Sequence, residues 1–290
     1  MPSFPLPRRA AGFASLSLLA LLAACGGGGS SAPDAAAAPS AAPAPTAATS
    51  VIAAATPASL MDLSGWKLNL PVDAYGGTGG TDGLQYPART VLPQELVAGF
   101  SDDFFRADAQ GRIVFTAPAN GAVTTPGNSS DHTRSELREF DRNGDAKGDW
   151  TGAGSLSATC EVQQVASAST KAIFGQLKGE NHVFAQLQYR VATQDLAVDV
   201  YHSDTDGSSH AATVLVPAVA LGQPIAYTLS FSGGVLTATA NGASRSFPVD
   251  GSWNTAPLYF KVGAYHGAPN TGNPAQDHTT VTCSGIAVAH

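Results

Sequence analysis

The sequence predicts an all-β protein, an antiparallel β-sandwich of the jelly-roll type with an open cleft on its concave sheet. Three observations support this fold class. From residue 60 onward, short runs rich in β-branched and aromatic residues alternate between apolar and polar positions with a period of two. Clusters of Gly, Asn, Asp and Pro separate these runs. Helical candidates are few and short, the best being residues 93–99, and no repeat of solenoid length is present.

The expected strands follow one another along the chain at 66–70, 113–115, 132–139, 156–162, 173–179, 183–191, 197–201, 227–240, 259–265 and 281–288. Together they span about 230 residues, a length that large all-β domains reach as a single unit. We therefore expect one jelly-roll domain over residues 60–290.

The first 24 residues have the pattern of an export signal. Arg8 and Arg9 precede an apolar run over residues 10–24, which has the length of a signal-peptide core and is too short to span a bilayer. The run ends in Leu22-Ala23-Ala24-Cys25, which resembles the lipobox of bacterial lipoproteins. We expect Cys25 to be the lipidated N-terminus of the mature chain. The alternative is an ordinary secretory signal that contains a cysteine.

Residues 25–59 are predicted to be a flexible tether, because Gly, Ser, Ala, Pro and Thr dominate and little apolar surface is available to bury. Loss of the signal peptide leaves 13 basic and 22 acidic residues, a net charge of −9. This acidic balance argues against a nucleic-acid partner. The expected location is the bacterial cell envelope, through a lipid anchor in the outer membrane, or the periplasm or extracellular space, and the expected state is a monomer.

Two cysteines remain in the predicted domain, Cys160 and Cys283. In an exported protein such a pair indicates a disulfide that closes a long loop. Two buried free thiols are the alternative.

Residues 132–139 carry an unusual row of charge. As a strand, this segment places one set of side chains on one face and Thr133, Ser135 and Leu137 on the other. Glu136 between two arginines orders both guanidinium groups by charge-assisted hydrogen bonds. The charged face consists of His132, Arg134, Glu136 and Arg138. It is either a rigid cationic surface for an anion or the solvated face of an edge strand.

Two further strands carry polar rows. Gln176 and Lys178 share one face of residues 173–179. On residues 259–265 the shared face holds Tyr259, Lys261, Gly263 and Tyr265. Three such rows in one sandwich indicate a polar groove on one sheet.

These residues resemble motifs of the alginate lyases of polysaccharide lyase family 7. Arg134-Ser135-Glu136-Leu137-Arg138 matches the arginine-bearing strand of that family, residues 259–265 match its C-terminal motif, and residues 65–72 are similar to its first strand. The resemblance covers nearly all of residues 60–290. It implies a jelly roll with an open cleft and cleavage of a 1,4-linked uronan, with alginate as the expected substrate, by β-elimination.

The central motif departs from the family pattern. The family usually has Gln-Ile-His or Gln-Val-His, whereas this chain has Gln176-Leu177-Lys178. Lys178 therefore stands at the histidine position, and Gly267 stands where a glutamine commonly follows the last tyrosine.

By resemblance, Arg134 and Gln176 stabilise the negative charge that develops at the uronate carboxylate, and Lys178 adds a full positive charge there. Tyr265 is the expected base. A free phenol has a pKa of about 10, and we expect nearby Arg and Lys charges to lower it. The expected substrate-binding residues are Arg138, Glu136, Lys261, His132 and Tyr259.

One phenol can take the C5 proton and protonate the C4 oxygen when both groups lie on the same side of the sugar ring. β-D-mannuronate and β-D-glucuronate have this syn geometry. Without the family histidine, we expect a preference for mannuronate-rich blocks or another syn uronan such as polyglucuronate. His132 or His182 could replace the missing imidazole, although a structural role is the simpler reading for each.

Other functions fit the sequence less well. A non-catalytic uronan-binding module would keep the arginine row but would not need Tyr265. A glycoside hydrolase needs two carboxylates that flank the bond, and Glu136 and Glu139 point to opposite faces. No cofactor or metal is expected, because zinc-ligand spacing is absent and residues 141–145 and 204–207 have the composition of turns.

Overall fold

The computed structural model describes residues 55–73, 87–125, 132–140, 150–179, 181–207, 209–268 and 277–290. The chain divides into two units, Met1–Val51 and Ile52–His290, and the described residues belong to the second. The predicted signal peptide, Cys25 and most of the tether lie outside them, as does the predicted turn at 141–145. Residues 57–59, which we expected in the tether, form a 3-10 helix with Pro57 buried.

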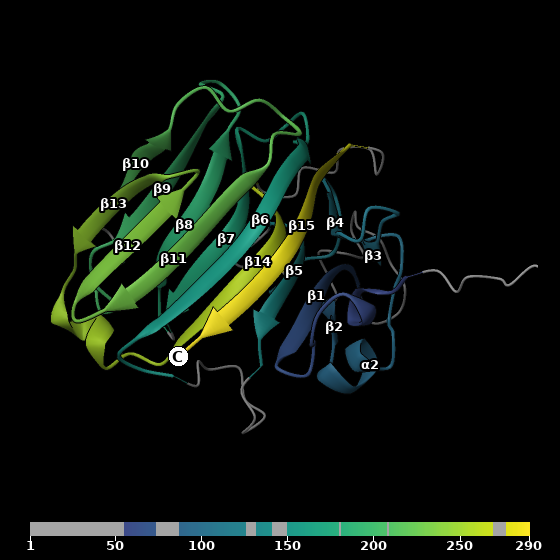
Figure 1. Ribbon diagram of the computed structural model, residues 1–290, viewed down its shortest axis with the longest axis horizontal. Coiled ribbons are helices and arrows are strands. Elements are labelled where there is room, and N and C mark those ends of the chain that lie inside the picture. Colours follow the sequence, from purple (N-terminus) through teal and green to yellow (C-terminus); the bar gives the residue numbers. More distant parts are fainter. Residues whose placement is uncertain are drawn as a thin grey trace, which may run out of the picture. The chain divides into compact units, whose positions relative to one another are not determined.

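Strands dominate the described residues (Figure 1). In the first half of the chain the elements are η1 (Pro57–Ser59), β1 (Trp66–Asp73), β2 (Ala88–Val91), α2 (Pro93–Val97), β3 (Phe105–Ala107), β4 (Ile113–Pro118), β5 (Arg134–Glu139) and β6 (Gly154–Gln164). In the second half they are β7 (Lys171–Gly179), β8 (Val183–Arg190), β9 (Asp195–Tyr201), β10 (His210–Val216), β11 (Ile225–Ser232), β12 (Val235–Ala240), β13 (Ala243–Pro248), η2 (Gly251–Asn254), β14 (Leu258–His266) and β15 (His278–Ala289).

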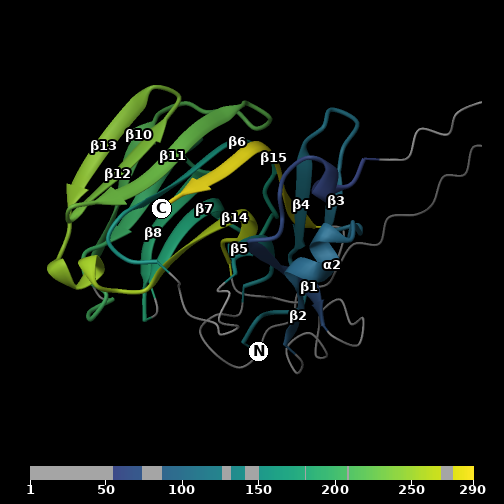
Figure 2. The same ribbon diagram turned by 60° about the horizontal axis from the view of Figure 1, so that its bottom comes forward.

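The strands form two antiparallel sheets that stack as layers (Figures 1 and 2). The eight-stranded sheet has the order β10-β9-β8-β7-β14-β5-β1-β2, and the seven-stranded sheet has the order β13-β12-β11-β6-β15-β4-β3. Strands distant in sequence, such as β5 and β14, are neighbours in these sheets. This arrangement confirms the predicted sandwich of the jelly-roll type.

The core lies between the sheets and is filled by the apolar residues of each alternating strand. Leu137 of β5 and Leu177 of β7 are fully buried in it. Aromatic rings meet across the two layers, since Phe174 of β7 lies edge-on to Tyr227 of β11 with ring centroids 5.6 Å apart. The inward face of each strand is therefore committed to packing, which leaves the opposite face of the eight-stranded sheet for polar side chains.

The predicted strand at 227–240 is wrong in one respect, because it is a hairpin of β11 and β12. Gly233 and Gly234 form its turn with φ values of 58° and 76°, a conformation that glycine adopts without the strain a side chain would bring. Strands β2, β3, β10 and β13 were not expected, and all four lie at sheet edges. β2 and β3 have only four and three residues, too few to show an alternation. β10 and β13 are largely exposed, so their sequences lack the apolar alternation that marks the inner strands.

A disulfide joins Cys160 of β6 to Cys283 of β15. The two residues are directly opposite each other in the strand pair, and both are fully buried in the core. The link connects positions 123 residues apart in the sequence.

Candidate active site

The three predicted polar rows lie on strands that are adjacent in the eight-stranded sheet. β14 pairs with β5 on one side and with β7 on the other. In this register Tyr265 is opposite Arg134, and Tyr259 is opposite Lys178. Lys261 lies between Arg138 and Gln176. Strand pairing thus converts three separate sequence motifs into one continuous polar surface.

A close approach of β14 and β5 depends on Gly263. A side chain at this position would place its Cβ 2.8 Å from Cα of Glu136 and even nearer to the carbonyl oxygen of Ser135. The register of β14 against β7 shifts between Val262 and Tyr265, beside this glycine. Gly263 therefore lets the strand carry Tyr265 to its place opposite Arg134.

A cavity of about 400 Å³ lies on this surface. Its lining brings together five of the predicted site residues, two from the arginine row, two from β7 and one from β14. The lining residues are His132, Arg134, Lys171, Ile173, Gln176, Lys178, Val183, Gln186, Tyr201, Tyr265 and Gly267. Cationic and amide donors together with a phenol thus line one open space.

Tyr265 contacts both a cation and an imidazole. The guanidinium carbon of Arg134 is 4.4 Å from the centroid of the Tyr265 ring, and the His132 ring centroid is 5.4 Å from it. Burial raises the pKa of Tyr265 above its ordinary value, and the charge of Arg134 offsets this only in part. The expectation that nearby cations lower the pKa of Tyr265 is therefore wrong, since desolvation of the phenol outweighs them.

Glu136 is the centre of a buried polar network beneath the cavity. Its carboxylate accepts a hydrogen bond from Lys261 Nζ at 2.5 Å and another from Gln176 Nε2. Arg134 Nη1 is 3.8 Å from the same carboxylate. Burial alone would raise the pKa of Glu136, but the charges of Lys261 and Arg134 hold the pKa below its usual value. Glu136 is therefore an ionised group that anchors three donors.

Glu136 and Lys261, which we expected to contact the substrate, do not belong to the cavity lining. Their side chains are only 1% and 5% exposed, and the two form an ion pair with each other. A carboxylate would in any case repel an anionic ligand. Burial lowers the pKa of Lys261 to about 7, and contact with Glu136 opposes this shift. The pair lies below the cavity and helps to hold the residues that line it in place.

Lys178 lies at the rim of the cavity, opposite Tyr259. Burial lowers the pKa of its ammonium group, and the charges of Arg134 and Arg138 lower it further, whereas Glu136 raises it. Lys178 is thus a cation held near two other cations, a position that an incoming anion would stabilise.

Arg138 and Tyr259 flank the cavity without lining it. The guanidinium carbon of Arg138 stacks 3.9 Å from the centroid of the Tyr259 ring. This contact fixes the arginine on the same face of the sheet as Arg134, where neighbouring parts of an extended ligand would pass.

Three histidines differ in their access to the site. His132 lines the cavity, and its Nδ1 lies 2.9 Å from the carbonyl oxygen of His266. His182 is absent from the lining and packs against Gly207 beside Asp204. His266 is fully buried, and burial lowers its pKa to about 4. Of the two candidates for a replacement imidazole, His132 is the one that reaches the cavity.

Sequence reasoning missed three polar residues of the cavity lining, Lys171 at the start of β7, Gln186 of β8 and Tyr201 at the end of β9. All three lie in, or directly beside, strands that were predicted. Gln186 alternates with apolar neighbours, so the period-two pattern already placed it on an outward face. What the sequence lacked was the information that β8 lies beside β7.

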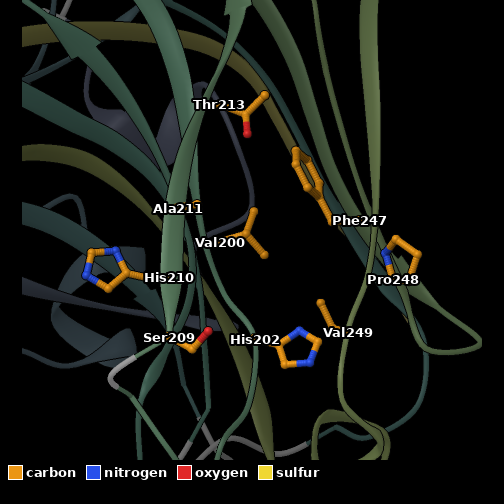
Figure 3. Close-up of a pocket in the computed structure, with 9 residues that line it drawn as sticks. All are labelled: Val200, His202, Ser209, His210, Ala211, Thr213, Phe247, Pro248 and Val249. Atoms are coloured by element: carbon orange, nitrogen blue, oxygen red, sulfur yellow. The ribbon is translucent and has the colours of Figure 1, made fainter.

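A second cavity, of about 240 Å³, lies between β9 and β10 on one side and the end of β13 on the other (Figure 3). Phe247 and Val249 face Val200 across it, and no lysine or arginine belongs to its lining. Within the described ranges, no group of three or more metal-binding side chains occurs, and no helix is long and apolar enough to cross a membrane. The cationic cavity is therefore the site that suits an anionic ligand.

Comparison with known proteins yields similar enzymes. Residues 61–290 match the family model described as alginate lyase. An alginate lyase of Klebsiella pneumoniae is 28% identical, with 82% of this chain and 92% of that protein covered. A solved alginate lyase of Pseudomonas aeruginosa is 27% identical with a TM-score of 0.66, covering 79% of this chain and 100% of its own. Alginate lyase A1-II', a member of polysaccharide lyase family 7, is 24% identical with a TM-score of 0.67, covering 81% and 99%.

Proposed function

The chain belongs to the alginate lyase family, and we propose that it cleaves alginate by β-elimination at the cavity of Arg134, Gln176, Lys178 and Tyr265. The observation that carries the proposal is the shared cavity, in which the cationic and amide donors of Arg134, Lys178 and Gln176 face the same space as the phenol of Tyr265. Such a set can hold a uronate carboxylate and also move a proton.

The donors serve the difficult step of the reaction. Removal of the C5 proton of a uronate puts additional negative charge on the adjacent carboxylate. Arg134 and Lys178 supply positive charge to that carboxylate, and Gln176 supplies an amide N–H. These interactions strengthen as the charge grows, so they lower the barrier rather than merely tighten binding.

Tyr265 transfers the protons. As tyrosinate it takes the C5 proton, the C4–O bond breaks as the C4=C5 double bond forms, and the resulting phenol protonates the departing C4 oxygen. Arg134 is placed to stabilise the tyrosinate, although burial keeps most of the phenol protonated near neutral pH. Each turnover thereby returns Tyr265 to its starting state and leaves one unsaturated sugar end.

We further propose a preference for mannuronate-rich blocks. A single Tyr265 suffices when the C5 hydrogen and the C4 oxygen lie on the same side of the ring, as in β-D-mannuronate. The family's histidine position holds Lys178, whose chemistry here is that of a cation. Polyglucuronate, which has the same syn geometry, is the alternative substrate.

A panel of separate polymannuronate, polyguluronate and polyglucuronate samples tests this function. The absorbance of the new double bond reports elimination and distinguishes a lyase from a hydrolase or a binding module. We expect the fastest release of unsaturated product from polymannuronate. Faster cleavage of polyguluronate would overturn the block preference, and binding without any unsaturated product would support a uronan-binding module instead.

We also propose that the mature chain is a monomer held at the bacterial outer membrane by a lipid on Cys25. The lipobox-like sequence before Cys25 supports this. Metabolic labelling with a fatty acid should mark the full-length chain and should not mark Cys25→Ser. Equal labelling of the two chains would exclude this anchor.

A further inference from the structure

A chain of side-chain hydrogen bonds runs across four strands, β8, β7, β5 and β14, beneath and beside the cavity. Gln186 of β8 is directly opposite Gln176 of β7. Gln186 Nε2 donates to Gln176 Oε1 at 3.0 Å, and Gln176 Nε2 donates to the carboxylate of Glu136. Lys261 donates to that carboxylate from the other side. All four side chains are less than 10% exposed.

The order of donors in this chain is fixed by charge. Lys261 can only donate, and ionised Glu136 can only accept. Gln176 must therefore turn its NH₂ group toward Glu136 and its oxygen away from it. That oxygen would then be a buried acceptor, and the NH₂ group of Gln186 satisfies it.

We propose that Gln186 is a positioning residue for the elimination reaction. It holds the side-chain amide of Gln176 in the orientation that Glu136 requires, in which one N–H binds Glu136 and the second N–H of the NH₂ group is left for the uronate carboxylate. With the amide turned over, the Gln176 oxygen would face that carboxylate and repel it. This inference rests on the proposed function of the cavity, and it assigns a role to a residue outside the three sequence motifs.

The position of Gln186 agrees with this role. Gln186 lines the cavity and is 7% exposed, so it borders the ligand space while its amide is held by Gln176. Gln188, two residues further along β8, lies on the same face and is 3% exposed. Gln188 is absent from the cavity lining, and its Oε1 has no hydrogen-bond partner among the described residues. It is therefore a matched control.

A double-mutant cycle on the full-length chain tests the proposal. The four enzymes are wild type, Gln186→Leu, Gln176→Ala and the double variant, with kcat and KM measured on polymannuronate. Gln186→Leu should lower kcat by about 10- to 100-fold, in line with the cost of leaving the buried amide oxygen of Gln176 without its donor. The same substitution in the Gln176→Ala background should cause no further loss, because the amide it orients is gone. Gln188→Leu should leave kcat unchanged.

The possible outcomes separate this inference from the proposed function. Additive losses in the cycle would show that Gln186 acts independently of Gln176 and would overturn the inference alone. A wild-type enzyme that makes no unsaturated product would overturn the proposed function and the positioning role with it. Gln186→Met has nearly the same shape without an N–H donor or a charge and covers the case in which Gln186→Leu does not fold. It should lower kcat in the wild-type background and not in the Gln176→Ala background.

Discussion

The guanidinium group of Arg134 stacks on the ring of Tyr265, with its central carbon 4.4 Å from the ring centroid. The stack places a permanent positive charge beside the phenol that we propose as base and acid. Burial nevertheless raises the pKa of Tyr265, so the resting phenol is protonated and only a small tyrosinate fraction can accept the C5 proton.

Because this fraction grows with pH, kcat should rise from neutral pH toward alkaline pH. Replacing Arg134 by Gln removes the positive charge that stabilises the tyrosinate, so the rise in kcat should move to higher pH. At neutral pH, kcat should fall at least tenfold, which corresponds to about one unit in the pKa of Tyr265. Profiles of kcat against pH for wild type and Arg134→Gln measure both effects. Coinciding profiles would show that Arg134 does not tune Tyr265.

The buried pair of Glu136 and Lys261 should contribute to folding as well as to the site. Glu136→Gln leaves the ammonium group of Lys261 buried without its counter-charge, and we expect a loss of about 3 kcal/mol or more in the free energy of unfolding. Urea titration measures the change. The double variant Glu136→Gln/Lys261→Met should recover part of the loss, because no lone buried charge remains. A double variant less stable than Glu136→Gln would contradict this account.

Lys178 should make substrate binding depend on pH. Burial and the neighbouring arginines lower its pKa, so its charge is present at low pH and is lost as pH rises, earlier than for an ordinary lysine. KM for polymannuronate should therefore increase with rising pH in the wild type. Lys178→Ala should have a higher KM that varies less with pH. Parallel KM profiles for the two enzymes would show that Lys178 does not bind the uronate carboxylate.

His266 should make the fold sensitive to acid. Its pKa is lowered to about 4 in the folded chain by burial and by neighbouring His132, whereas Asp277 opposes the shift. As the pH falls, His266 in the unfolded chain therefore binds a proton near pH 6.5, before His266 in the folded chain does. The contribution of neutral His266 to the free energy of unfolding is fully present above pH 6.5. This contribution falls by on the order of 2 kcal/mol as the pH decreases toward 4. Denaturant titrations of wild type and His266→Leu should show a smaller loss in the variant, and equal losses would contradict the assignment.

The sequence predicted the inner strands and the cationic face because both follow from alternation within one segment. Leu137 and Arg134 already point to opposite faces in a strand of period two, whichever strand lies beside it. Edge strands β10 and β13 escaped prediction because they are mostly exposed, which removes the apolar half of the pattern.

The electrostatic properties of the site could not be predicted from sequence. They depend on how deeply each group is buried and on which strand lies beside which. The ion pair of Glu136 with Lys261 exists only because β14 lies between β5 and β7. For the same reason the direction of the Tyr265 pKa shift was predicted wrongly, since counting nearby cations takes no account of desolvation.

The most direct test of the proposed function compares the full-length wild type with Tyr265→Phe on polymannuronate, following the absorbance of the unsaturated product. Removal of one hydroxyl leaves the ring in place beside Arg134 and removes the group that transfers the protons. We expect product from the wild type and a loss of at least about 100-fold in kcat for Tyr265→Phe, with the fold intact. Equal rates for the two enzymes would contradict the mechanism.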